Sequence, residues 1–147
     1  MQTKFLGVIV AALAAALLLA WKTPVTQDGG SESALHASME DLNSTLRRVD
    51  RLIKDEQKIS EAVDLVVEME HDALDAKGEV PPRAARLEGA ARDAFVLGYR
   101  RDMIKLLVTL TELEMACLEG QTDAAQAVVE RLVSHRNASH DLYQDEE

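Results

Sequence analysis

Apolar residues recur along most of this chain at alternating intervals of three and four positions. That spacing places them on one face of an α-helix, with charged residues on the other faces. Four such stretches follow one another, over residues 35–55, 58–76, 83–118 and 122–143. The pattern therefore predicts four amphipathic helices, each with one face to bury. The first stripe consists of Leu35, Met39, Leu42, Leu46, Val49 and Ile53.

Stop signals separate the predicted helices and keep the connections short. Gly78 is followed by Pro81 and Pro82, and Gly120 comes directly after the third stretch. Glycine just beyond a helix and proline soon after it are typical of helix ends. Aromatic residues make up only 3% of the chain, which argues against β-sheets. Because short connections make successive helices antiparallel, we predict an all-α fold, an antiparallel up-down-up-down four-helix bundle.

The beginning of the chain has a different character. Residues 1–4 are short and basic, and residues 5–21 contain no charge. This is the layout of a secretory signal, and an uncleaved anchor in the inner membrane is the alternative. We predict a signal peptide or anchor over residues 1–22, a flexible linker over 23–34 and a bundle domain over 35–147. Either kind of leader places the bundle domain outside the cytoplasm, with membrane attachment only if the leader is retained.

The charge balance bears on the class of partner. Lysine and arginine number 16 against 26 aspartates and glutamates, a net charge of −10. An acidic surface repels the phosphate backbone, so nucleic acid is not an expected partner. The same surface predicts weak, salt-sensitive docking to a basic protein. Cys117 is the single cysteine, so no internal disulfide can form, and we expect it to be a buried apolar residue.

Two candidate ligands lie at matching depths in the predicted bundle. Met39 is about one turn from the start of the first helix, and His140 is about one turn from the end of the last. Because these helices run antiparallel, both residues are expected at the same end of the bundle. A thioether and an imidazole facing each other can hold a haem iron from both sides. A methionine that fills the core and a solvated histidine remain the alternative interpretation.

Arg136 lies one turn before His140 on the same predicted face. An arginine at a core end needs an anionic partner, which a haem propionate would supply. A carboxylate on the first helix, or solvent, is the alternative partner. Residues 136–140 lack both cysteines of the Cys-x-x-Cys-His motif that attaches haem covalently. Any haem is therefore expected to be held by coordination and packing alone.

Other functions stay open at this point. A haem-free helical bundle acting as a chaperone or a stress sensor would have a similar leader and similar helices. No nucleophile–base pair or phosphate-binding glycine loop occurs in the sequence, so an enzyme is not expected. A divalent-metal binder would have to use the four histidines, but they lack the spacing of facing ligands. The histidines are His36, His71, His135 and His140.

Four stretches of the sequence resemble the cytochrome b562 family, and the similarity covers essentially the whole bundle domain. Residues 39–43 resemble the family's methionine-bearing segment, and residues 136–140 resemble its histidine-bearing segment. Residues 73–82 and 119–127 resemble the end of its second helix and the turn between its third and fourth helices.

The resemblance implies a periplasmic b-type cytochrome with one non-covalent haem b per chain. It implies Met39 and His140 as axial ligands, and a propionate or haem-edge contact for Arg136. Since two axial side chains leave no position for a substrate, the implied function is one-electron transfer to a redox partner protein. The chain is expected to be a monomer. The side chains expected to surround the haem are Leu42, Leu46, Tyr99, Met103 and Val133.

Overall fold

A computed structural model describes residues 30–143 of the chain, and the predicted leader and most of the predicted linker lie outside these residues. The described part is all-α: no strand occurs between residues 30 and 143. The predicted fold class is confirmed. The elements in chain order are α2 (Gly30–Leu52), η1 (Ile59–Ala62), α3 (Val63–Gly78), η2 (Pro82–Arg86), α4 (Gly89–Leu118) and α5 (Thr122–Tyr143).

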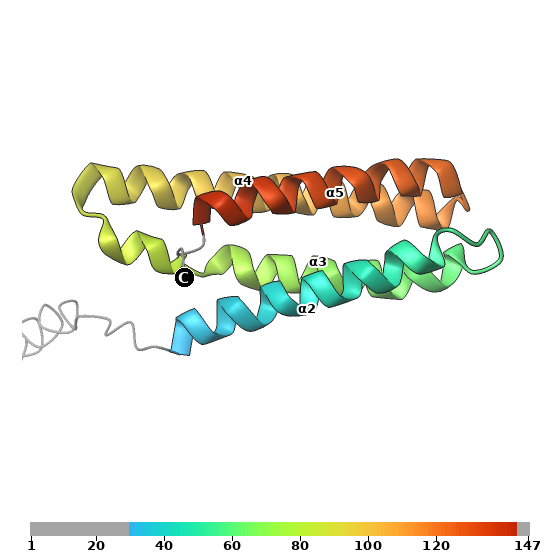
Figure 1. The fold of residues 1–147 in the computed structure, drawn as a ribbon, viewed down its shortest axis with the longest axis horizontal. Helices are drawn as coiled ribbons and strands as arrows, with labels where there is room; N and C mark the ends of the chain where they lie inside the picture. The colour runs from blue at the N-terminus through green and yellow to red at the C-terminus, as the bar shows by residue number, and fades with distance from the viewer. Residues whose placement is uncertain (1–29, 144–147) are drawn as a thin grey trace, which may run out of the picture.

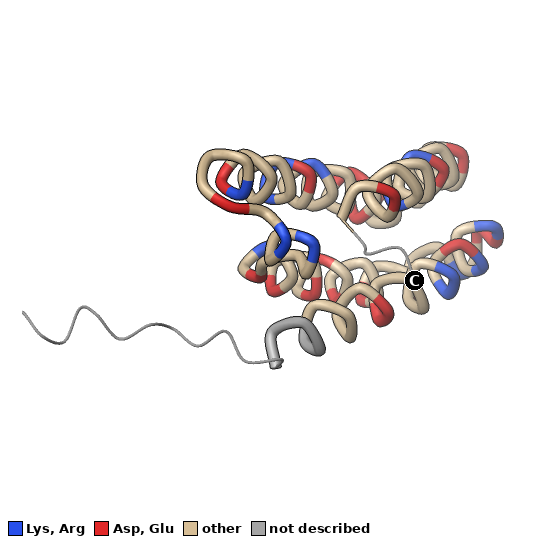
Figure 2. Tube along the Cα trace, turned by 60° about the vertical axis from the view of Figure 1, so that its left-hand side comes forward, with Lys and Arg blue, Asp and Glu red and all other residues tan. Residues whose placement is uncertain are grey.

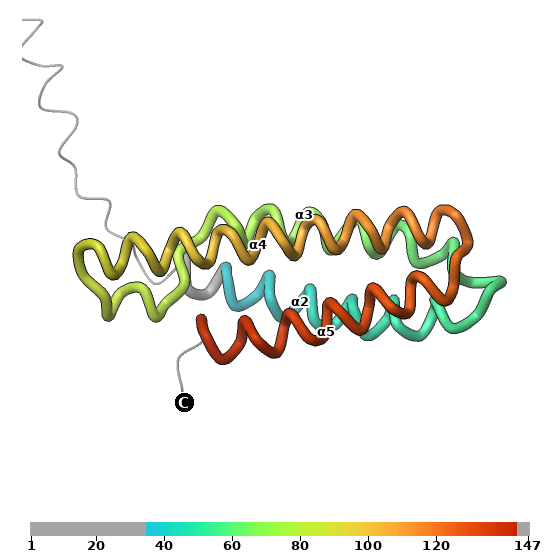
Figure 3. The backbone as a smooth tube through the Cα atoms, turned by 90° about the horizontal axis from the view of Figure 1, so that it is seen from above, coloured from blue at the N-terminus to red at the C-terminus, as the bar shows by residue number. Residues whose placement is uncertain are grey.

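The four long helices form an antiparallel bundle in which each packs against the next in sequence. Helix α2 packs on α3, α3 on α4, and α4 on α5. Figure 1 shows the helices running along one common axis, and Figure 3 shows α3 and α4 on one side with α2 and α5 on the other. The contact between α2 and α5 is sparse compared with the other three. The bundle is therefore loosest along this one seam.

The inner faces of the helices form one continuous hydrophobic core. The stripe predicted for the first helix is buried apart from Met39, which packs against the core from its margin. Cys117 is buried as predicted, and burial raises the pKa of its thiol. The spacing in the last predicted helix places Val129, Val133, Arg136, His140 and Tyr143 on one inner face, and this prediction was wrong in part. The buried residues of α5 are Ala125, Val128, Val129 and Leu132, whereas Val133 and Tyr143 are half-buried and His140 is exposed.

Two predicted helix starts differ from the structure. Helix α2 begins at Gly30, inside the predicted linker. The stretch predicted as one helix over residues 83–118 is broken, because η2 ends at Arg86 and α4 begins at Gly89. Gly89 has a φ of 53°, a left-handed conformation that glycine adopts without steric cost. The chain can therefore turn sharply there before α4 starts.

The short η2 segment also holds the end of the last helix. Arg83 Nη1 donates hydrogen bonds to the carbonyl oxygens of Asp141 and Leu142, at 3.4 and 3.1 Å. The last carbonyls of a helix have no partner within the helix, so a cation there is favourable. The α3–α4 connection is in this way tied to the last turn of α5.

Acidic and basic residues are interspersed along the helices, as Figure 2 shows. Between residues 30 and 143, no helix combines the length and the apolar character needed to cross a membrane.

Candidate functional site

A cavity of about 630 Å³ opens at the end of the bundle where α2 begins and α5 ends. This volume lies within the range of pockets that hold small molecules and cofactors. All four long helices and the α3–α4 connection contribute to its wall. The lining residues are Leu35, His36, Met39, Leu42, Asn43, Leu46, Met69, Pro81, Pro82, Tyr99, Asp102, Met103, Leu106, Leu132, His135, Arg136, Ser139, His140 and Tyr143.

The structure brings the two candidate ligands to the same cavity. Met39 reaches it from the third turn of α2, which begins earlier than predicted, and His140 reaches it from the last turn of α5. Met39 is half-buried and His140 is exposed. The thioether and the imidazole therefore approach the cavity from two antiparallel helices at one end of the bundle.

The other predicted site residues line this cavity with one exception. Leu42, Leu46, Tyr99 and Met103 belong to its wall, but Val133 does not. Val133 is half-buried against the core, and its neighbour Leu132 lines the cavity instead. The difference follows from the rotation of α5, whose core face passes through Val128 and Leu132.

Arg136 connects the two helices that carry the candidate ligands. Its Nη1 donates to Oδ1 of Asn43 on α2 at 2.6 Å, and its Nε and Nη2 donate to Oδ1 of Asn137 at 3.2 and 3.0 Å. The sequence left a carboxylate on the first helix as one alternative partner, but the partner found there is an amide. Amide oxygens carry no net charge, so the guanidinium brings a positive charge to the wall of the cavity.

Tyrosine side chains close the cavity beside α4. The buried Tyr99 hydroxyl donates to the carbonyl oxygen of Ala76 at 2.7 Å. Burial, and then the negative charge of Glu79, raises the pKa of Tyr99 to about 12, so it stays neutral at physiological pH. The Tyr143 ring packs edge-on against Phe95 and Tyr99, each with a centroid separation of 5.3 Å. The last turn of α5 is thereby fixed against α4.

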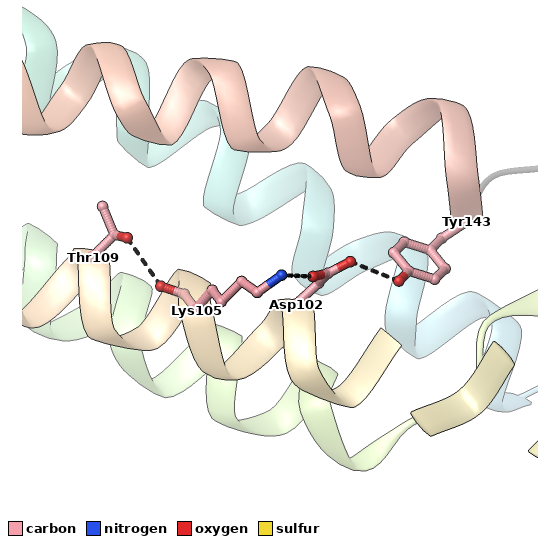
Figure 4. Close-up of polar contacts among 4 residues, drawn as sticks. All are labelled: Asp102, Lys105, Thr109 and Tyr143. Atoms are coloured by element: carbon pink, nitrogen blue, oxygen red, sulfur yellow. Dashed lines mark hydrogen bonds and ion pairs between the residues drawn. The ribbon is translucent and has the colours of Figure 1, made fainter. Parts of the chain in front are cut away.

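A carboxylate on the cavity wall anchors the second tyrosine. Asp102 accepts hydrogen bonds from the Tyr143 hydroxyl and from Lys105 Nζ, both at 2.7 Å (Figure 4). Burial by itself would raise the pKa of Asp102, but these hydrogen bonds and the charges of Lys105 and His135 outweigh it and lower the pKa. Asp102 is therefore ionised at neutral pH, and its negative charge fixes the Tyr143 hydroxyl in place.

Residues 34–144 match the sequence model of the cytochrome b562 family. The chain belongs to the cytochrome b562 family. The match covers the bundle apart from the first four residues of α2. A search among curated proteins found no match. Cytochromes b562 are b-type haem proteins and electron carriers, so the fold and the family agree with a cofactor in the end cavity.

The residues of the cavity fit a haem b. Its wall is mostly aliphatic and aromatic, as a porphyrin ring requires, and polar groups lie mainly toward the end of α5. A thioether and an imidazole are both established types of haem ligand. The guanidinium of Arg136 is suited to an anionic propionate.

The sequence analysis did not predict several of the residues that line the cavity. His36 and Asn43 lie one turn from Met39, and Ser139 lies one turn from Arg136, so helical spacing alone could have identified them. Pro81 and Pro82 come from the α3–α4 connection. No periodic pattern predicts where such a connection folds back.

Replacing Tyr143 with phenylalanine tests the contact with Asp102. We expect Tyr143→Phe to reduce the free energy of unfolding by about 1–2 kcal/mol at pH 7, since a hydrogen bond to a charged group is lost. The pKa of Asp102 is lowered in the folded state, so its stabilising contribution exists above the ordinary aspartate pKa and is lost as the pH falls through the folded value. Urea unfolding of the parent and the variant at pH 7 and at pH 3 measures the effect. The difference between their free energies of unfolding should be smaller at pH 3. An equal difference at both pH values would contradict the hydrogen bond between Tyr143 and Asp102.

Proposed function

We propose that this protein is a one-electron carrier that binds one haem b without covalent attachment, with Met39 and His140 as the axial ligands. The observation that supports this most directly is that both side chains line one cavity, each from one of two antiparallel helices. Membership of the cytochrome b562 family gives the cofactor class. The absence of a Cys-x-x-Cys-His motif from the sequence favours binding by coordination and packing alone.

The side chains of the cavity have distinct tasks in this proposal. When bound, haem supplies an iron that alternates between the ferric and ferrous states. Met39 and His140 would hold the iron through a thioether and an imidazole, and two such protein ligands would leave no position for oxygen or a substrate. The thioether of Met39 favours the reduced state relative to a second imidazole. The apolar wall, with Leu42 and Leu46, excludes water and disfavours additional positive charge.

The location and the partner of the protein are part of the same proposal. The uncharged segment over residues 5–21 supports export to the periplasm, either as a cleaved signal or as an anchor in the inner membrane. The net charge of −10 supports a redox partner with a basic docking face. Association of this kind is fast and reversible, and it weakens as salt is added.

Visible absorption of the purified protein tests the proposal. We expect the protein, as isolated or after titration with haem, to take up one equivalent and to give sharp bands of low-spin iron in the reduced-minus-oxidised spectrum. A pyridine assay should identify haem b. A protein that stays colourless and does not bind added haem would instead be a haem-free bundle, such as a chaperone or a stress sensor.

Arg136 is expected to strengthen haem binding through a propionate. We expect Arg136→Gln to weaken haem affinity about tenfold, because a hydrogen bond between two charged groups is lost. Arg131→Gln is a matched control, since Arg131 lies on the same helix but pairs with Glu112 outside the cavity. Titration of each apoprotein with haem measures the effect. Equal affinities for the two variants would contradict a propionate contact.

A further inference from the structure

Helix α4 is apolar on two opposite sides, and only one of them faces the core. The inner side is buried through Tyr99, Met103, Leu110, Leu113 and Cys117. The outer side carries a second row of large apolar residues whose exposed fractions run from 49 to 61%. An ordinary helix on the surface of a bundle is polar on its outer side, so this row calls for an explanation. The row consists of Leu97, Ile104, Val108, Met115 and Leu118.

The outer row has the spacing of a coiled-coil seam. Its members follow one another at intervals of seven, four, seven and three residues. Arg101 and Thr111 occupy the two positions that complete an unbroken alternation of four and three. A heptad pattern of this kind forms a straight stripe along a helix and pairs with a similar stripe on another helix. The row therefore suits a helical partner of comparable length.

The charges beside the row indicate the identity and the direction of that partner. Between Leu97 and Val108 the helix carries three basic residues, and its one acidic residue there, Asp102, lines the cavity. Between Val108 and Leu118 it carries two acidic residues and no basic ones. A second α4 laid antiparallel would place each basic half beside an acidic half. The basic residues are Arg100, Arg101 and Lys105, and the acidic ones are Glu112 and Glu114. Lys105 and Glu112 already pair within the chain, with Asp102 and Arg131, so contact with a partner falls to Arg100, Arg101 and Glu114.

We propose that the outer row of α4 is a dimer interface, in which it pairs antiparallel with the same row of a second copy of this chain. The twofold axis passes near Val108, so that the same patch is used on both copies. Arg100 of each copy then lies close to Glu114 of the other. The proposed homodimer differs from the monomer expected from the sequence. Because the inner side of α4 lines the cavity and the outer row lies opposite, the dimer leaves the cavity accessible.

Sedimentation velocity of the protein as isolated, over a wide range of concentration, tests the interface. We expect a dimer at high concentration, and we expect the double variant Ile104→Glu/Val108→Glu to weaken association by at least about a hundredfold. Leu74→Glu is the matched control, because Leu74 is an exposed leucine of α3 outside the row. Both changes are at exposed positions, and unfolding curves should be close to that of the parent. A parent that is monomeric throughout, or a dimer that the double variant leaves unchanged, would overturn the proposal.

A charge exchange tests the antiparallel direction. We expect Arg100→Glu and Glu114→Arg to weaken association about tenfold each, since each introduces like charges across the interface. The double variant Arg100→Glu/Glu114→Arg restores opposite charges and should recover most of the parent's association. Failure of the double variant to recover would overturn the antiparallel arrangement, as would single variants that associate as strongly as the parent.

Discussion

A His140→Ala variant is expected to lose the six-coordinate, low-spin spectrum of the haem protein. The change removes the only proposed nitrogen ligand, so the iron keeps one axial side chain and becomes high-spin. His140 is exposed, so the apoprotein should stay folded when its side chain is shortened. Visible spectra of the oxidised and reduced variant measure the effect.

Two further histidines on the cavity wall provide controls for this result. His36→Ala and His135→Ala alter the same cavity and should keep the parent spectrum. If one of them abolished the low-spin bands while His140→Ala did not, that residue would be the ligand and our assignment would be wrong.

The sulfur ligand is tested by substitutions that keep volume. Met39→Leu removes the thioether while it preserves the shape of the side chain, so we expect the same change to a high-spin spectrum. Met103→Leu makes the identical change at another position on the cavity wall and should keep the low-spin bands. A low-spin spectrum in the Met39→Leu variant would contradict axial ligation by Met39.

A Leu110→Ala variant is expected to destabilise the bundle by about 3 kcal/mol. Leu110 is fully buried in the second half of α4 and is not among the residues that line the cavity. Leucine-to-alanine changes at such sites cost about 2–5 kcal/mol, because the removed methyl groups leave a void. Urea unfolding of the apoprotein should show this loss in full.

Comparing Leu42→Ala with Leu110→Ala distinguishes the packing of the cavity wall from the packing of the core. Leu42 already borders the cavity, so shortening it enlarges an existing space and should cost the apoprotein less than Leu110→Ala does. Its main effect should appear as weaker haem affinity, measured by titration. If Leu42→Ala destabilised the apoprotein as much as Leu110→Ala, the cavity wall would be packed as tightly as the core.

The sequence predicted the bundle well because each helix has to bury a stripe of apolar residues. Such a stripe is recognised from apolar residues at intervals of three and four positions. Helix α5 was harder, because the spacing from Val129 to Val133 suggested one face, whereas the buried face runs through Val128, Val129 and Leu132. The break before α4 depends on the left-handed conformation of Gly89, which helical spacing does not reveal.

The sequence predicted that Met39 and His140 lie at the same end of the bundle, and both line the cavity there, whereas their role as haem ligands stays a prediction. The candidate site was not predictable where distant segments meet. The hydrogen bond from Arg136 to Asn43 and that from Tyr143 to Asp102 join residues far apart in the sequence. Their formation depends on how the helices are rotated about their axes, which no local pattern records.

The bond from Arg83 to the last carbonyls of α5 bears on how the proposed cofactor could be exchanged. His140 stands on the final turn of α5, and this turn is fastened from outside by the α3–α4 connection. The seam between α2 and α5 is the loosest in the bundle. We expect that breaking the hydrogen bonds of Arg83 frees the last turn of α5 beside this seam. The proposed cofactor would then enter and leave the cavity through the same local opening.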